Sequence, residues 1–228
     1  MNLLSRAVHS LRGQGWAATA AKLLGPLVDR QFDGKYGVET CGITPLEGLT
    51  ISGANKEHGA RYQPTRVLRL RKMLFVLRFI TPADSVLVDI GCGKGRVLLL
   101  AAQHGFREVR GVEFARELCE TARHNWAAFQ ARTGSQTKCR IIQADVTEYA
   151  IQPEEQVFFL FNPFDETILG KLLANLAASL RTAPRKILLL FYFPSPRYRP
   201  VIDQRPEFAL VREYRFWGCD FALYSNYT

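Results

Sequence analysis

Short apolar segments alternate with helical segments from residue 83 to the C-terminus, and this alternation limits the fold more than any other feature of the sequence. The strand at 157–161 is almost wholly apolar, which indicates a parallel sheet whose two faces are both buried by helices. The sequence therefore predicts an α/β fold with a doubly wound, mostly parallel sheet. Its predicted strands are 86–90, 109–113, 140–143, 157–161 and 187–193, and its predicted helices are 96–104, 115–131 and 166–180.

The two ends of the chain follow other patterns. Two strand-like runs flank Gly218, which predicts an antiparallel hairpin at the edge of the sheet. Residues 1–33 contain no acid before Asp29 and predict one or two short basic amphipathic helices. A glycine-rich loop over 33–64 and a helix over 66–79 follow. We expect residues 1–82 to form a basic helical cap with this loop, and residues 83–228 to form the sheet domain.

Basic side chains outnumber acidic ones, with 30 Lys and Arg against 21 Asp and Glu. Residues 1–82 hold 12 of the basic and 5 of the acidic side chains. This excess would steer an acidic partner, such as a nucleic acid or an anionic lipid surface, toward the N-terminal third, although a positive surface also simply keeps a protein soluble. The longest apolar runs reach about seven residues, well short of the roughly 18 of a membrane span.

The cysteines also limit the function classes. The chain has five cysteines, an odd number, and they are widely spaced without a CxxC pair. This pattern favours free thiols in a reducing, cytoplasmic compartment and predicts no metal site.

A glycine-rich loop follows the first predicted strand, in the segment VLVDIGCGKGR at residues 86–96. Gly91, Gly93 and Gly95 let the backbone turn sharply and approach a ligand, and the next helix offers free N–H groups. Asp89 precedes the first glycine by two residues. A carboxylate at this place repels a pyrophosphate and attracts an ammonium or sulfonium group, so Asp89 favours a cationic ligand over NAD.

Two further carboxylates end the next two strands. Glu113 can accept hydrogen bonds from both hydroxyls of a ribose. Asp145 can accept one from the exocyclic amine of an adenine, with Phe114 and Val146 on the two faces of the base. Because the carboxyl ends of parallel strands meet at one edge of a sheet, the three acids suit a ligand with cationic, diol and amine parts.

Four segments, VLVDIGCGKGRVLLLAA, RGVEFARELCETARHN, IIQADV and FLFNPF, together resemble the motif series of the class I S-adenosylmethionine-dependent methyltransferases. The resemblance covers about residues 84–194 and implies a Rossmann-like sheet with an antiparallel last strand. It also implies S-adenosylmethionine as cofactor and S-adenosylhomocysteine as product. The family's motifs would place Gly91, Gly93 and Gly95 around the methionine moiety, Asp89 near its amino group, Glu113 on the ribose and Asp145 on the adenine.

The segment after the fourth strand, Asn162-Pro163-Phe164, stands where many family members hold residues that face the transferred methyl group. It is similar to the Asn-Pro-Pro-aromatic motif of amino-group methyltransferases but lacks the second proline, and it favours a nitrogen acceptor. Asn162 would also contact the cofactor. A weaker similarity to the non-SET histone-lysine methyltransferases, in GVEFARELCETARHN, is accompanied by Tyr62, which sits where such proteins place a tyrosine loop over the methionine end. Tyr62 can offer its hydroxyl to a ligand carboxylate and its ring to exclude water, and it is a candidate general base together with Asp165 and Glu166.

We therefore expect a methyltransferase that acts on a nitrogen of a protein or of a small amine-bearing molecule. Two alternatives stay open. One is an RNA methyltransferase whose basic N-terminal third holds phosphates. The other is a non-catalytic module that contacts a membrane or a partner protein through residues 1–30.

Overall fold

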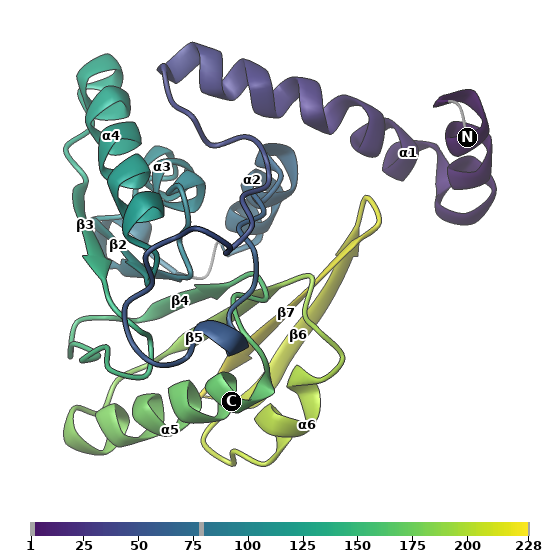
Figure 1. Ribbon diagram of the computed structural model, residues 1–228. Helices are drawn as coiled ribbons and strands as arrows, with labels where there is room; N and C mark the ends of the chain where they lie inside the picture. The colour runs from purple at the N-terminus through teal and green to yellow at the C-terminus, as the bar shows by residue number, and fades with distance from the viewer. Residues whose placement is uncertain (1–2, 78–79, 228) are drawn as a thin grey trace.

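The structure, a computed structural model, describes residues 3–77 and 80–227, without the side chains of residues 3–17. A seven-stranded sheet with the order β3-β2-β1-β4-β5-β7-β6 forms its centre (Figure 1). The strands are β1 (Val86–Ile90), β2 (Glu108–Glu113), β3 (Lys138–Gln143), β4 (Val157–Leu160), β5 (Leu188–Tyr192), β6 (Ala209–Phe216) and β7 (Cys219–Ser225).

The pairing of the strands confirms the predicted fold class. β1 pairs in parallel with β2 and with β4, and the parallel part continues to β3 and β5. β7 runs antiparallel to β5, and β6 pairs with β7 in the predicted hairpin, with a register shift between Leu210 and Arg212. The doubly wound order reverses between β1 and β4, so the carboxyl ends of these strands mark the place where ligands bind in such sheets.

Helices cover both faces of the sheet (Figure 1). α2 (Val67–Val76) and α3 (Arg96–Gln103) share a hydrophobic cluster with one face, which α4 (Arg116–Thr133) joins through Phe129. α5 (Glu166–Thr182) and α6 (Tyr198–Asp203) cover the other face. The strand residues alternate between the two clusters, with Leu87 on the first face and Val88 on the second.

The N-terminal region differs from the prediction. α1 is one helix from Leu3 to Tyr36, and it passes through Pro26 without ending. The predicted loop therefore begins at residue 37, because Phe32 and Tyr36 continue the helix and pack into the same cluster as α2. Gly25 and Pro26 lie inside this helix, whose C-terminal part contacts α2 and α4. α6 was also missed, since it is short and contains Pro200.

Candidate cofactor site

A cavity of about 270 Å³ lies at the carboxyl ends of β1, β2 and β4. Residues 44–65, which we name the covering segment, cross above these strand ends. Most of the predicted site residues line the cavity, whereas Gly93 and Gly95 are not part of its wall. The residues that do line it are Tyr62, Asp89, Gly91, Glu113, Phe114, Asp145, Val146, Asn162, Pro163 and Phe164.

The loop between β1 and α3 needs glycine for two separate reasons. Gly91, Gly93 and Gly95 all have positive φ, at 75°, 52° and 83°, a conformation that favours glycine. Space is also short, because a Cβ atom on Gly93 would lie 2.2 Å from Cδ2 of Tyr62 and one on Gly91 would lie 2.5 Å from Cβ of Pro163. The loop is thus packed tightly against the covering segment and the segment after β4.

Asp89 lies on β1 beneath this loop and is 2% exposed. Its Oδ2 atom is buried and has no hydrogen-bond partner among the described residues. Burial raises the pKa of Asp89 well above its usual range, and the nearby Glu113 carboxylate raises it further. A buried acid without a partner is costly unless a ligand neutralises it, so this atom is suited to a positively charged group.

Glu113 ends β2 and organises the backbone around the cavity. Its Oε2 accepts a hydrogen bond from the Gly93 amide at 2.9 Å, and its Oε1 accepts one from the Ala115 amide at 3.0 Å. Burial raises the pKa of Glu113, and the hydrogen bonds from these two amides lower it by a smaller amount. Each carboxylate oxygen can accept more than one hydrogen bond, so both remain suited to hydroxyl donors.

Asp145 is held by the covering segment as well as by its own turn. Its Oδ1 accepts hydrogen bonds from the amide and hydroxyl of Thr147, and its Oδ2 accepts one from Nδ2 of Asn55 at 2.6 Å. Although burial acts in the opposite direction, these donors hold the pKa of Asp145 below its usual value. The sequence reasoning missed Asn55, which donates to the carboxylate that was predicted to bind an adenine amine.

The covering segment is joined to the site by backbone bridges. Ile51 pairs with Ala115, next to the end of β2, and Gly59 pairs with Phe164, after β4. Beside this second bridge, Nδ1 of His58 lies 2.6 Å from Oδ2 of Asp165, the N-cap residue of α5. The segment is thus fixed to the chain at two places, after β2 and after β4.

Tyr62 lies over the glycine loop as the sequence suggested, but its hydroxyl has a different partner from the one expected. The ring packs on Gly93, and the hydroxyl donates to the Thr40 carbonyl at 2.7 Å instead of to a ligand carboxylate. Burial raises the pKa of Tyr62, so the hydroxyl is unsuited to act as a base. Its contribution to the site is to wall the loop off from water.

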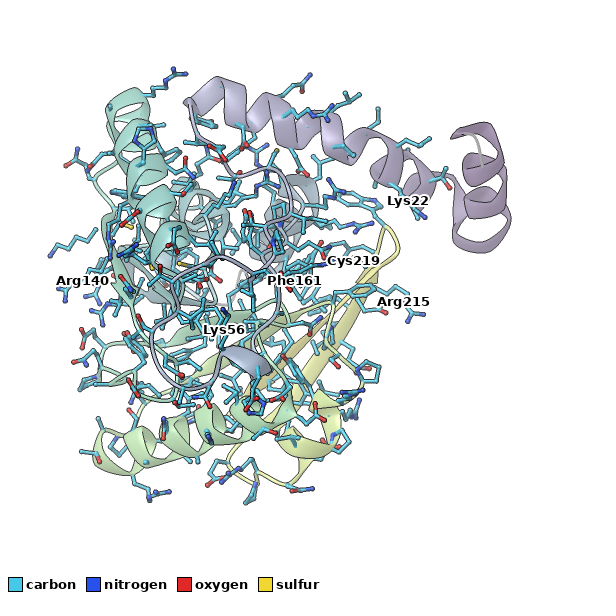
Figure 2. All side chains as sticks on the ribbon, viewed as in Figure 1. Lys22, Lys56, Arg140, Phe161, Arg215 and Cys219 are labelled. Atoms are coloured by element: carbon cyan, nitrogen blue, oxygen red, sulfur yellow. The ribbon has the colours of Figure 1, made fainter. Side chains whose placement is uncertain are left out.

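Asn162 lines the cavity, and its side chain also binds backbone groups of the loop after β5. Its Nδ2 donates to the Phe193 carbonyl at 2.7 Å, and its Oδ1 accepts from the Ser195 amide at 3.0 Å. Both Asn162 and Phe193 have positive φ, at 44° and 50°. The Asn162 side chain therefore ties the loops after β4 and β5 together. Figure 2 shows Phe161, which immediately precedes it, near the centre of the molecule at the cavity wall.

A buried arginine, Arg96, anchors the covering segment and α1 to α3. It is 2% exposed, its Nε donates to Oγ1 of Thr40 at 2.7 Å and its Nη1 donates to the Thr65 carbonyl at 2.9 Å. The same guanidinium lies 3.3 Å from the Asp29 carboxylate and 3.7 Å from that of Asp33. Nothing in the glycine motif pointed to this role, because all of its partners are at least 31 residues away in the sequence.

Two other features of the described residues bear on function. They contain no helix that is both long and apolar enough to span a bilayer. They also contain no group of three His, Cys, Asp or Glu side chains placed to hold a metal ion.

Part of the sequence resembles a known protein family. Residues 87–183 match the family described as a methyltransferase domain. The matched part contains β1 to β4, the glycine loop and all three carboxylates. Comparison with curated proteins finds no match.

Solved structures show the same fold. An RNA methyltransferase from Salinibacter ruber, in complex with S-adenosylhomocysteine, is similar with a TM-score of 0.51 and 21% identity, over 72% of this chain and 93% of that one. The magnesium protoporphyrin IX methyltransferase of Synechocystis, with S-adenosylmethionine bound, has a TM-score of 0.53 and 16% identity, over 70% of this chain and 77% of that one. The chain therefore has the class I methyltransferase fold, as the sequence motifs implied.

Proposed function

We propose that this chain is an S-adenosylmethionine-dependent methyltransferase that transfers a methyl group to a nitrogen of a protein lysine or of a small amine. The observation that carries the proposal is Oδ2 of Asp89, a buried carboxylate oxygen without a partner at the wall of the cavity. Glu113 and Asp145 line the same cavity, so its titratable groups favour a cationic nucleoside over a phosphate-bearing nucleotide.

The residues of the site fit this cofactor. When bound, S-adenosylmethionine supplies a methyl carbon that its sulfonium already activates, so alignment and exclusion of water account for most of the catalysis. Asp89 would neutralise the cationic end, Glu113 would accept from the ribose hydroxyls, and Asp145 would accept from the adenine. Phe114 and Val146 line the same cavity and would contact the base.

The acceptor nitrogen would approach from the segment after β4. Its lone pair forms the new N–C bond in line with the breaking S–C bond, so a lysine must arrive as the neutral amine. Phe161 and Phe164 line the cavity here. Their rings can pack against the acceptor amine, including an amine that already carries methyl groups. Asn162 would act as a positioning residue, because its side chain is engaged by the backbone of residues 193 and 195.

Calorimetry with S-adenosylmethionine tests the cofactor. We expect binding that Glu113→Ala or Gly93→Val abolishes, since the first removes a ribose partner and the second places a side chain against Tyr62. Glu148→Ala, an exposed acid on the turn after Asp145, is the matched control and should bind normally. Unchanged binding in both site variants would contradict the proposed cofactor site.

A radiolabelled methyl-transfer screen across protein, RNA and small-molecule fractions of a lysate tests the acceptor. We expect label in an amine of the protein or small-molecule fraction, and none when Asn162→Ala enzyme is used at saturating cofactor. Label in RNA, with retention of RNA at low ionic strength, would favour the alternative that the basic residues of the N-terminal third suggest. If the chain binds the cofactor but transfers label to no fraction, the result would favour the alternative of a non-catalytic module.

A further inference from the structure

α1 has a second apolar face that no described residue covers. Gly25, Asp29 and Phe32 follow one another at helical spacing and are buried against the domain. Leu23, Leu24 and Leu27 lie on the opposite side of the helix and are 42%, 52% and 53% exposed. Buried and exposed faces of a surface helix are normally apolar and polar respectively, so a row of exposed leucines needs an explanation.

The charges around these leucines have one sign. The exposed charged side chains on the described part of α1 are Lys22, Arg30 and Lys35, and α1 has no acidic residue before Asp29. Asp29 is turned inward, where its carboxylate lies 2.7 Å from Arg66 and 3.3 Å from Arg96. At helical spacing Arg30 and Lys35 flank the leucines, one on each side, whereas Lys22 lies nearer to the buried side of the helix. The outer face of α1 therefore combines the leucines with Arg30 and Lys35.

The position of α1 makes this face accessible. Only the C-terminal part of the helix packs on α2 and α4, and the N-terminal part extends beyond the body of the domain (Figure 1). Figure 2 labels Lys22 on this extending part of the helix. A helix with this arrangement can lie flat on a surface without moving the cofactor site.

We propose that α1 lies on an anionic membrane surface, with Leu23, Leu24 and Leu27 in the interface and Arg30 and Lys35 against lipid head groups. Apolar burial and attraction to anionic lipid act together in such helices, and neither alone gives firm binding. A second copy of the chain fits less well, because a symmetric contact would bring the same cations of two helices together. The proposal concerns this face alone and does not depend on the cofactor or the acceptor.

Sedimentation of the full chain with vesicles tests the proposal. We expect binding to vesicles of equal parts phosphatidylglycerol and phosphatidylcholine, and little to phosphatidylcholine alone. Leu23→Asp with Leu27→Asp should weaken binding at least about tenfold, and Arg30→Glu with Lys35→Glu should do the same. All four side chains are exposed, so the folded domain should keep its thermal unfolding temperature.

Matched control variants separate this face from general effects of charge. Val211→Asp on β6 changes an equally exposed apolar side chain, and Lys171→Glu with Arg181→Glu on α5 removes the same number of exposed cations. Both controls should bind anionic vesicles like the unmodified chain. Equal losses in controls and α1 variants would overturn the proposal, as would an absence of binding. A dimer in solution that Leu27→Asp dissociates, without vesicle binding, would assign the face to a second copy.

Discussion

Asp89 sets the electrostatics of the cavity. Its buried oxygen has no partner among the described residues, and its raised pKa means that the cofactor-free protein keeps this carboxyl protonated to a higher pH than usual. Ionised Asp89 attracts a cation, whereas protonated Asp89 does not. Binding of a cationic cofactor must therefore be coupled to loss of the Asp89 proton.

The first prediction follows from this coupling. The affinity for S-adenosylmethionine should increase as pH rises through the raised pKa of Asp89 and level off above it, because less free energy is then spent on removing the proton. Asp89→Asn should bind more weakly by at least tenfold, about 1.4 kcal/mol, and should lose this pH dependence. Calorimetry over a pH series measures both effects. Asp203→Asn on α6 is the control, and an equal pH dependence in Asp89→Asn would contradict the assignment.

The second prediction concerns the contact between Gly93 and Tyr62. Gly93→Ala should destabilise the protein by about 1–3 kcal/mol, because the residue has a φ of 52° and its new Cβ would lie 2.2 Å from the Tyr62 ring. In a double-mutant cycle with Tyr62→Ala, part of this loss should disappear, since the ring is gone while the backbone strain remains. Denaturant unfolding gives the free energies. If the losses in free energy of unfolding of the two single variants simply add in the double variant, the Tyr62 ring and the glycine loop do not contact each other.

At the scale of elements, one buried guanidinium joins three parts of the chain. Arg96 begins α3, and it binds carboxylates of α1 and the carbonyl of Thr65 at the end of the covering segment. The buried face of α1 and the cavity wall thus share an anchor. Any loosening of this anchor should affect the shape of the cofactor site as well as the stability of the fold.

The third prediction is that Arg96→Met destabilises the protein by about 3–5 kcal/mol, because it leaves Asp29 and Asp33 buried or half-buried without this cation. Arg116→Met on α4, where the arginine is exposed and only loosely paired, should change the free energy of unfolding by less than about 1 kcal/mol. Urea unfolding of both variants provides the comparison. A small effect at Arg96 would mean that Arg66 alone satisfies Asp29.

The elements differ in how far the sequence predicts them. The five strands predicted before the hairpin lie within two residues of the observed ones, because apolar runs and glycine turns are local signals. The continuity of α1 could not be predicted, since it depends on contacts of Asp29 and Phe32 with distant residues. The same limit applies to the site. The carboxylates at the strand ends follow from the topology, whereas Asn55 and Arg96 act through partners far away in the sequence.

At the scale of the whole molecule, the covering segment connects the N-terminal third to the sheet domain. It pairs with the backbone after β2 and after β4, and Asn55 reaches the carboxylate after β3. A cofactor in the cavity would lie between this segment and the strand ends. Binding should therefore order the segment, although it is remote in sequence from the glycine motif.

The fourth prediction is that S-adenosylhomocysteine slows amide hydrogen exchange across residues 44–65 as well as in the glycine loop. Asn55→Ala should reduce this protection, because one link between the segment and Asp145 is lost, while exchange in β5 stays unchanged. Hydrogen exchange followed by mass spectrometry, with and without ligand, resolves these regions. Protection confined to residues 89–95 would show that the covering segment moves independently of the cofactor. In that case the hydrogen bonds of Asn55 and His58 would hold the covering segment over the cavity equally well with and without ligand.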